Sequence, residues 1–363
     1  MIMDQIKIQT SSKSYPVYIG HGAIKVLGEH LKNRIGSYTS VMVITDETVA
    51  GLYLPKLKEQ SGLNGVFEKI VPSGEKAKTF DVYYDCLSAA LEHKLDRKSL
   101  IISFGGGAVG DLAGFVAATF MRGISFIQVP TTILAHDSAV GGKVAINHPS
   151  GKNMVGAFHQ PDAVIYDLDF IESLPDKEVR SGFAEVIKHS LIYDEEFYNW
   201  LLGGVHSLAN LDAEKMKTFL TKGIHIKGQI VAKDEREAGV RAHLNFGHTL
   251  GHSIEAEAGY GKVTHGEAVA IGMVFALQLS SEVTGLTFNH EEFKTWLQSL
   301  GYRTSLPEGL TVERLIFRMK QDKKAVREAV RFVLLNRIGS PELAEVNEHV
   351  LLTSLNRFKE RGE

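Results

Sequence analysis

At 363 residues the chain is longer than a single hydrophobic core usually serves, so two domains are expected. Its apolar content of 44% and charged content of 23% are ordinary for a globular protein and exclude the disordered, collagenous and disulfide-rich classes. A formal net charge of -3 gives the whole molecule no attraction for nucleic acid or an anionic membrane. Neither is an expected partner, and any anionic ligand must be held by local groups of Lys and Arg.

The N-terminal residues 1–7 alternate apolar and polar side chains, as a strand does, and carry no hydrophobic signal-peptide region. No apolar run is expected to reach membrane-spanning length, so we expect a cytoplasmic protein. Cys86 is the only cysteine, which excludes an intramolecular disulfide and a zinc site built from several cysteines. It lies in a helical apolar pattern, which predicts a buried thiol in the core.

Short β-branched runs alternate with helical patterns through the first part of the chain. The pattern predicts strands at 41–45, 100–104 and 124–129, and helices at 78–93 and 110–120. This βαβ alternation indicates a mostly parallel, Rossmann-like sheet with helices on its faces.

Beyond about residue 170 the pattern changes to long amphipathic segments with few strand signals. Helices are predicted at 177–191, 195–208, 216–232 and 248–258, and a largely apolar, buried helix at 268–282. We therefore expect an α/β domain at 1–172 followed by an all-α domain at 173–363.

A glycine-rich turn joins the predicted strand at 100–104 to the next helix. Gly105, Gly107 and Gly110 fit the pattern G-x-G-x-x-G, and such a turn exposes backbone N–H groups at a helix start to a phosphate. The following strand lacks the acidic residue of the ordinary dinucleotide fingerprint, whereas Asp46 ends an earlier strand. Nucleotide binding and tight helix-to-sheet packing both remain open on spacing alone.

A polar stripe marks the predicted helix that begins near residue 248. His248 and His252 lie four residues apart on one helical face, where a core helix should be apolar. Asn245 precedes them, His265 lies just before the predicted helix at 268–282, and Glu185 lies in an earlier one. Two histidines and a carboxylate are a frequent ligand set for catalytic zinc, but the spacing does not choose the third ligand.

In order along the chain, these motifs resemble the 3-dehydroquinate synthase family, and the resemblance runs from about residue 46 to residue 335. It is carried by segments 72–78, 105–115, 130–132, 137–143, 151–153, 184–188, 241–252, 265–267 and 322–324, together with Arg122. The resemblance implies NAD and a divalent metal, zinc or cobalt, as cofactors. It also implies a homodimer in which Arg122 reaches the neighbouring site.

The resemblance assigns roles to individual residues. It implies a metal held by Glu185, His248 and His265. The nucleotide contacts that it implies are Asp46, Ser73, Gly74, Glu75, Lys78, Gly106, Gly107, Ala108, Val109, Gly110, Asp111, Thr131, Thr132, Lys143, Lys152, Phe170 and Ser173. The substrate and catalytic contacts are Arg122, Asp137, Lys143, Asn153, Lys188, Lys227, Arg241, Asn245, His252 and Lys323 or Lys324.

The implied substrate is a phosphorylated sugar acid, 3-deoxy-D-arabino-heptulosonate 7-phosphate. Its phosphate would contact Lys143, Asn153, one lysine of the pair at 323–324 and Arg122, and its carboxylate Lys227 and Arg241. Transient oxidation by NAD, loss of phosphate, re-reduction, ring opening and an aldol step would yield 3-dehydroquinate. Lys188, Asn245 and His252 would manage the hydroxyl and carbonyl protons.

Three other functions fit parts of the sequence. The first is another NAD- and metal-dependent sugar-phosphate cyclase, whose substrate lacks the carboxylate that Lys227 and Arg241 would bind. The second is a polyol dehydrogenase of the glycerol dehydrogenase type, which would accumulate NADH. The third is an inactive binding protein that retains the fold, against which the nearly complete set of polar residues argues.

Overall fold

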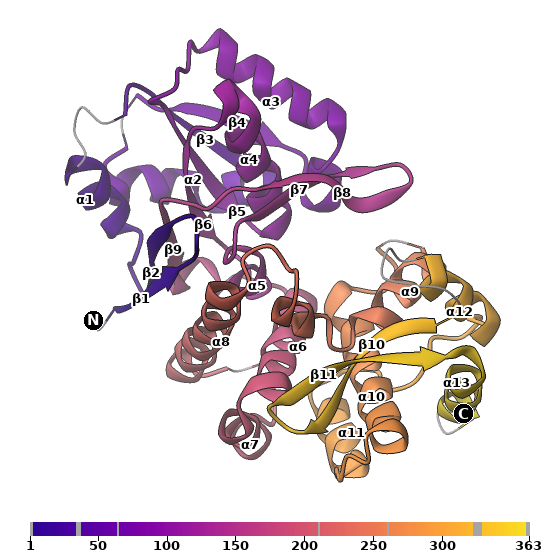
Figure 1. Ribbon diagram of the computed structural model, residues 1–363. Helices are drawn as coiled ribbons and strands as arrows, with labels where there is room; N and C mark the ends of the chain where they lie inside the picture. Colours follow the sequence, from indigo (N-terminus) through magenta and orange to yellow (C-terminus); the bar gives the residue numbers. More distant parts are fainter. Residues whose placement is uncertain are drawn as a thin grey trace. The chain divides into compact units, whose positions relative to one another are not determined.

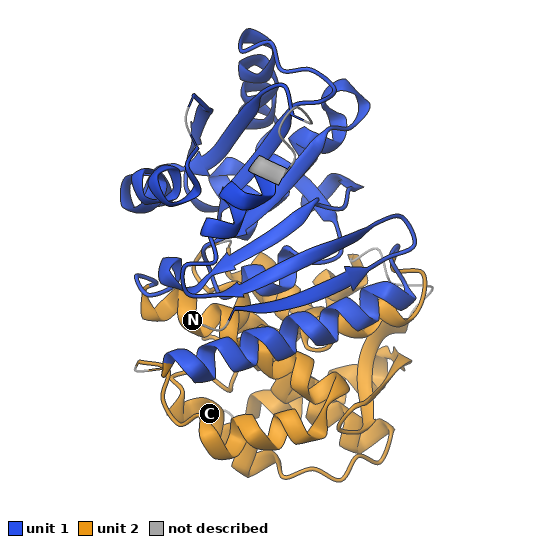
Figure 2. Cartoon of the chain, turned by 90° about the vertical axis from the view of Figure 1, so that its left-hand side faces the viewer, with its two compact units in different colours: residues 1–174, 213–236 blue, residues 175–212, 237–363 orange. Residues whose placement is uncertain are grey.

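The computed structural model describes residues 3–33, 38–63, 65–209, 211–259, 261–321 and 329–360, and it divides the chain into two compact units. Unit 1 comprises residues 1–174 and 213–236, and unit 2 comprises residues 175–212 and 237–363 (Figure 2).

A seven-stranded sheet forms the centre of unit 1 within the described residues. Its strands lie in the order β1 (Asp4–Gln9), β2 (Ser14–Gly20), β9 (Ala163–Asp167), β6 (Ser125–Pro130), β5 (Leu100–Gly105), β3 (Val41–Asp46) and β4 (Phe67–Val71). The neighbours pair in parallel except for β1 and β2, which are antiparallel. The predicted parallel-dominated α/β unit is confirmed.

Both faces of the central strands β3, β5, β6 and β9 are buried, which explains why these strands are apolar at successive positions. Met42 and Ile44 belong to one core cluster, whereas Val43 between them belongs to the cluster on the opposite face, because strand side chains alternate. The cluster of Met42 and Ile44 also contains Cys86, as predicted, and burial raises the pKa of this thiol to about 12.

The helices and smaller elements of unit 1 connect and cover the strands (Figure 1). They are α1 (Lys25–Asn33), α2 (Glu47–Ser61), α3 (Phe80–Glu92), α4 (Gly107–Thr119), α5 (Ala135–Ser138), α8 (Ala213–Lys233), η1 (Gly74–Ala77), η2 (Phe120–Arg122), η3 (Leu168–Phe170) and the hairpin of β7 (Lys143–His148) and β8 (Gly151–Phe158).

The strand order places a topological switch between β3 and β5. The chain goes from β3 to its neighbour β4 and then returns to form β5 on the other side of β3. In an open α/β sheet, the carboxyl ends of the strands at such a switch form the usual ligand-binding crevice. Asp46 ends β3 and Gly105 ends β5, so this edge is a candidate nucleotide site.

Helix α8 corrects the expected domain boundary. The expected boundary places it with residues 173–363, but it packs on β1 of unit 1, where Lys217 forms a salt bridge of 3.0 Å with Asp4. Gly228 makes this packing close, since a Cβ there would lie 2.5 Å from Ile8 Cδ1. An amphipathic pattern reveals that a helix has a buried face, but not which domain buries it.

Unit 2 is helical, as predicted, with one antiparallel hairpin that the sequence did not reveal (Figure 1). Its elements are α6 (Asp176–Tyr193), α7 (Glu195–Gly204), η4 (Val240–Asn245), α9 (His248–Ala258), α10 (His265–Val283), α11 (His290–Ser299), α12 (Val312–Gln321), β10 (Ala329–Arg337), β11 (Ser340–Asn347) and α13 (Glu348–Glu360). Helix α10 is long and apolar enough to cross a membrane, contrary to the expectation that no run reaches that length. However, 78% of its apolar window is buried inside the protein, as in a core helix.

Candidate active site

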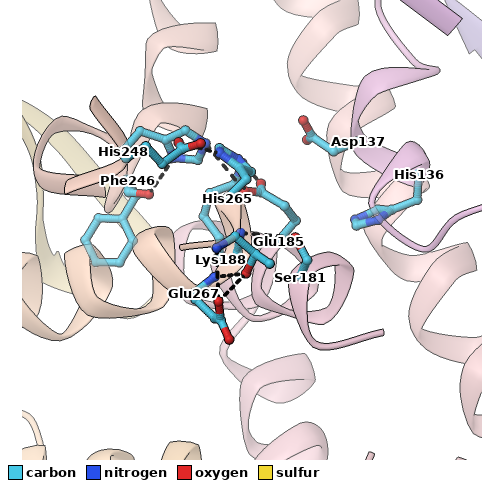
Figure 3. Close-up of polar contacts among 12 residues, drawn as sticks. His136, Asp137, Ser181, Glu185, Lys188, Phe246, His248, His265 and Glu267 are labelled. Carbon is cyan, nitrogen blue, oxygen red and sulfur yellow. Dashed lines mark hydrogen bonds and ion pairs between the residues drawn. The ribbon is translucent and has the colours of Figure 1, made fainter. Parts of the chain in front are cut away.

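Three helices of unit 2 bring Glu185, His248 and His265 together (Figure 3). Glu185 Oε1 lies 3.4 Å from His248 Nε2 and 3.2 Å from His265 Nε2. The Glu185 side chain is only 1% exposed, so its negative charge is held in a poorly hydrated place that favours a cationic partner. The candidate metal ligands therefore meet at one point, with one oxygen and two nitrogen atoms facing each other.

The remaining ring nitrogens of both histidines have fixed partners. His248 Nδ1 lies 3.1 Å from the carbonyl oxygen of Phe246, and His265 Nδ1 lies 3.0 Å from Glu255 Oε2. Both partners are acceptors, so each Nδ1 carries the proton, and in the neutral imidazole each Nε2 retains a lone pair. Such outer contacts are typical of metal-binding histidines.

The ionisation of these histidines is set by their surroundings. Burial lowers the pKa of His248 well below its usual value, so this ring is neutral and able to act as a ligand. Burial also disfavours the charged form of His265, but hydrogen bonds to Glu185 and Glu255 outweigh it and raise the pKa to about 10. His265 must therefore release a proton when a cation takes its place beside Glu185.

Glycines allow the three helices to approach this closely. A Cβ on Gly266 would lie 2.1 Å from the carbonyl oxygen of Ser181, one turn before Glu185. A Cβ on Gly272 would lie 1.9 Å from the carbonyl oxygen of Gly247, the residue before His248. No side chain fits at these points, so the glycines set the helix spacing on which the ligand geometry depends.

Other predicted residues of unit 2 lie on two of these helices and on η4. The ammonium of Lys188 donates a hydrogen bond to Glu185 Oε2, on the carboxylate oxygen that does not face the histidines. His252 is exposed one turn beyond His248, with ring centroids 5.2 Å apart. Asn245 Nδ2 donates to Glu237 Oε1 at 2.9 Å, and Arg241 in η4 is 1% exposed.

At the sheet edge of unit 1, Asp46 caps α2. Its Oδ1 accepts hydrogen bonds from Thr48 N, Val49 N and Ser73 Oγ, at 2.9, 3.1 and 3.0 Å. Its Oδ2 accepts none from the part of the chain that the structure describes. Thr131, which follows β6, likewise has a buried Oγ1 without a partner among the described residues. These two groups fit a ligand with hydroxyl or phosphate groups at the switch point.

The glycine-rich turn serves packing as well as any ligand. A Cβ on Gly110 would lie 2.9 Å from Gln128 Oε1, and one on Gly114 would lie 2.3 Å from Val144 Cγ1. By contrast, Gly106 is the N-cap of α4 and a Cβ there would meet Thr132 Cγ2 at 3.1 Å. A Cβ on Gly107 would lie 2.9 Å from Ser138 Oγ, so this glycine and the later ones hold α4 against its neighbours. Gly106 lies at the start of the helix, where the first N–H groups have no partner within the helix.

The other residues predicted to contact the nucleotide differ in their exposure and in the elements that carry them. Glu75 is exposed on η1, Ser173 is exposed after η3, and Lys152 is on β8. Phe170 and Val109 are each 1% exposed. The ring of Phe170 packs against Phe104 and Tyr53 in the core, so a ligand would reach this residue only through its main chain.

Two ion pairs lie among the candidate nucleotide and substrate residues of unit 1. Lys78 Nζ lies 2.6 Å from Asp111 Oδ2 and also donates to Asn153 Oδ1. Lys227 of α8 forms a 3.0 Å salt bridge with Asp137 Oδ2. Burial raises the pKa of Asp111 while Lys78 opposes this shift, so the lysine stabilises the carboxylate form.

Arg122 is exposed at the end of η2 in a strained backbone. Met121 and Arg122 have φ of 50° and 69°, and Gly123 follows with φ of 115°. Side chains other than glycine rarely adopt this left-handed region, and such strain is concentrated at functional positions. Lys143 is exposed on β7, and Lys323 and Lys324 lie outside the described residues.

Two polar residues of these regions were missed from the sequence. Glu255 accepts a hydrogen bond from His265, and Asn147 of β7 is hydrogen-bonded to Glu75 and to the main chain of Asn153. Glu255 is seven residues after His248 and three after His252, so the helical face that carries the histidines also indicated this carboxylate. No comparable signal marks Asn147.

Comparisons with known proteins cover nearly the whole chain. Residues 68–181 match the family described as 3-dehydroquinate synthase N-terminal, and residues 182–325 match 3-dehydroquinate synthase C-terminal. A 3-dehydroquinate synthase of Bacillus cytotoxicus is 54% identical, covering 98% of this chain and 97% of the relative. One of Geobacillus kaustophilus is 53% identical, with 98% of each chain covered.

Solved structures share the fold. A 2-deoxy-scyllo-inosose synthase complexed with carbaglucose-6-phosphate, NAD+ and Co2+ has a TM-score of 0.89 at 24% identity, covering 98% of this chain and 100% of that chain. A 2-epi-5-epi-valiolone synthase of Streptomyces hygroscopicus with NAD+ and Zn2+ bound has a TM-score of 0.84 at 22% identity, covering 97% and 99%.

Proposed function

The chain belongs to the 3-dehydroquinate synthase family, and we propose that it converts 3-deoxy-D-arabino-heptulosonate 7-phosphate into 3-dehydroquinate and phosphate with bound NAD and a divalent metal. The curated relatives that match over almost all of both chains carry this activity in their names. The solved neighbours whose titles mention NAD+ with Co2+ or Zn2+ support the same cofactors here.

The observation that carries the proposal is the meeting of Glu185 Oε1 with the Nε2 atoms of His248 and His265. One carboxylate and two imidazoles fit Zn2+ or Co2+ and leave a coordination position open for substrate oxygens. A cation bound there supplies Lewis acidity to a substrate hydroxyl, which is worth several kcal/mol in the transition state. The chain contributes the orientation of the ligands, through Phe246 and Glu255.

Polar side chains near these ligands would handle protons and charge. The hydrogen bond from Lys188 to Glu185 holds the positively charged ammonium of Lys188 directly beside the metal ligands. There the ammonium would stabilise an oxyanion that develops on the substrate. His252 is exposed next to His248, where its ring would exchange protons with a substrate hydroxyl. For the substrate carboxylate we propose the guanidinium of Arg241, in unit 2, and the ammonium of Lys227, in unit 1.

For the nucleotide, we propose the carboxyl edge of the sheet in unit 1. Asp46 Oδ2 would accept hydrogen bonds from ribose hydroxyls, and the N-terminus of α4 after Gly106 would bind the pyrophosphate. Bound NAD supplies a hydride acceptor for one substrate carbon and returns the hydride later, so no NADH should accumulate. Thr131 would supply a further hydroxyl at this edge.

The test is a simultaneous measurement of phosphate release and absorbance near 340 nm, with metal- and NAD-loaded protein and the heptulosonate phosphate. Phosphate should be released while absorbance at 340 nm stays at its starting level. Accumulation of NADH would indicate a polyol dehydrogenase instead. Preference for a sugar phosphate without a carboxylate would indicate one of the other cyclases, and absence of any turnover would indicate a binding protein.

The proposal also includes a cytoplasmic homodimer in which Arg122 serves the neighbouring active site. The strained backbone that holds Arg122 at the surface supports this role. Arg122→Ala and His248→Ala proteins, each inactive, would be mixed and allowed to exchange subunits. If Arg122 acts across the dimer, hybrids hold one intact site and recover about a quarter of wild-type activity. If the subunits exchange and no activity is recovered, Arg122 serves the active site of its own subunit. Cell fractionation tests whether the protein is cytoplasmic.

A further inference from the structure

Asn147 makes three hydrogen bonds within unit 1, and each one ends on a segment assigned to a ligand. Its main-chain N–H donates to the carbonyl oxygen of Lys78 at 2.7 Å. Its side-chain Nδ2 donates to Glu75 Oε2 at 2.6 Å, and its Oδ1 accepts the main-chain N–H of Asn153 at 3.0 Å. Strand β7 is thereby tied to η1 on one side and to β8 on the other.

The orientation of the Asn147 amide follows from these partners. The N–H of Asn153 is a donor and must face the oxygen, whereas the carboxylate of Glu75 is an acceptor and must face the NH2 group. An aspartate at this position would keep the first contact and place two carboxylates against each other in the second. The two contacts can therefore be separated by one substitution.

The hydrogen bonds close a ring through the buried Lys78. The Lys78 carbonyl accepts from Asn147, Asn147 accepts from the Asn153 main chain, and Asn153 Oδ1 accepts from Lys78 Nζ. Asn153 has a φ of 57°, a conformation that needs support from its surroundings. Lys78 is 2% exposed, so the ring is anchored in the body of the unit.

We propose that Asn147 is a positioning residue that links the nucleotide contacts at Glu75 and Lys78 to the substrate-phosphate contact at Asn153. The proposal rests on the proposed function, which assigns these three residues to NAD and to the substrate. Through its two side-chain contacts, Asn147 orients Glu75 for the nucleotide and holds the main chain of Asn153 in its left-handed conformation. Loss of the side chain should therefore weaken the binding of both ligands, although the proposed function assigns neither ligand a contact with Asn147.

The test compares Asn147→Ala and Asn147→Asp with the metal-loaded wild-type enzyme. The measurements are the Kd of NAD by calorimetry, the KM of the heptulosonate phosphate and the Tm. Because each lost contact involves a charged or strained group, Asn147→Ala should raise both constants by about tenfold. Asn147→Asp should raise the Kd of NAD by a similar factor while the KM rises less than about threefold, since the bond to Asn153 remains.

A double-mutant cycle identifies the contact responsible. In Asn147→Asp with Glu75→Gln, the glutamine NH2 group can donate to the aspartate, so the NAD defect should be several-fold smaller than the product of the single defects. Asn336→Ala is the matched control, because it removes an equivalent Asn–Glu hydrogen bond of 2.7 Å in the β10–β11 hairpin. It should leave both constants unchanged.

An unchanged Kd of NAD and an unchanged KM in Asn147→Ala would overturn the proposal. Equal increases of the two constants in Asn147→Asp would also overturn it. So would a double mutant whose increase in the Kd of NAD equals the product of the two single increases. Should Asn147→Ala fail to fold, the aspartate variant and the cycle still decide. A wild-type enzyme that neither binds NAD nor releases phosphate would reject the proposed function itself, whereas a working wild type with unaffected variants would reject only the role of Asn147.

Discussion

The candidate metal centre of unit 2 and the glycine-rich turn of unit 1 use glycine for different purposes. At the metal centre, Gly266 and Gly272 let helices touch, and the ligands that result are oriented by further hydrogen bonds. In the turn, Gly110 and Gly114 also serve packing, whereas Gly106 leaves a helix start open. A glycine pattern alone therefore does not distinguish a turn that binds a ligand from one that only allows close packing. Histidines and a carboxylate that face each other, with the other nitrogen of each histidine hydrogen-bonded, indicate a metal site more directly.

The largest expected effect comes from His248→Ala, which removes one ligand of the metal centre. Loss of several kcal/mol of Lewis-acid stabilisation should lower kcat by at least about 1,000-fold. Metal content after dialysis should fall with it, while circular dichroism shows that the helices persist. If His248→Ala protein kept near-normal turnover after a chelator had removed its metal, the activity would not depend on this metal centre.

Replacing Glu255 by Ala should weaken the metal centre without removing a ligand. The His265 ring would lose the acceptor that fixes its orientation, and removal of such partners lowers metal affinity by about 10- to 100-fold. Competition with a chromophoric chelator measures this affinity. Glu255→Gln should lose less, because its amide oxygen can still accept the hydrogen bond, and equal losses would count against an orienting role.

Gly266→Ala tests whether helix contact sets the ligand geometry. Its Cβ would lie 2.1 Å from the Ser181 carbonyl, so the helices must separate at a cost of about 1–3 kcal/mol in the free energy of unfolding. Metal affinity should fall as well. Gly203→Ala in α7 is the control, since nothing lies within 4 Å of a Cβ there, and it should be neutral or slightly stabilising.

Gly106→Ala in unit 1 should impair ligand binding with little effect on stability, unlike Gly266→Ala, which should lower stability and metal affinity together. The added Cβ meets Thr132 Cγ2 at 3.1 Å, which a small shift relieves, so stability should change little. A bound pyrophosphate would lose close access to the helix start, and the Kd of NAD should rise by about tenfold while metal affinity stays constant. An unchanged Kd would mean that this glycine serves packing only.

The smallest effect concerns acid stability at Glu235, in the segment 213–236. Burial raises the pKa of Glu235, but hydrogen bonds from Ser11, Ser12 and Gln160 outweigh it and lower the pKa to about 2. A depressed pKa contributes stability above the unfolded value of 4.5, and this stability is lost as pH falls toward 2. Glu235→Gln should therefore have a lower urea midpoint at neutral pH, with the difference from wild type shrinking below about pH 4.

The sequence predicted most of the helices and strands because each depends on the pattern of apolar and polar residues within its own segment. The strands β3, β5 and β6 and the helices α6, α9 and α10 follow from runs of apolar and polar residues. The packing of α8 on unit 1 did not follow, since it depends on contacts between residues distant in the sequence. The β10–β11 hairpin was missed as well, within a region dominated by helical patterns.

The candidate site was less predictable from the residues themselves. The spacing of His248 and His252 indicated a metal but did not choose between His252, His265 and Glu185, because these residues come from three separate helices. The resemblance to a family made that choice, and in the structure Glu185 Oε1 lies 3.4 Å from His248 Nε2 and 3.2 Å from His265 Nε2. Asn147 has no sequence signal, since its role depends on partners in β8 and in η1 with its C-cap that only the folded chain brings within reach.

The most direct test of the metal centre is an anomalous-scattering map from crystals of the zinc-loaded protein, collected on both sides of the zinc absorption edge. One peak should lie about 2.0–2.2 Å from a Glu185 oxygen and from the Nε2 atoms of His248 and His265. His252, Glu255 and His265 form a second group of possible ligands. A peak on that group, or no peak near Glu185, would contradict the proposed centre.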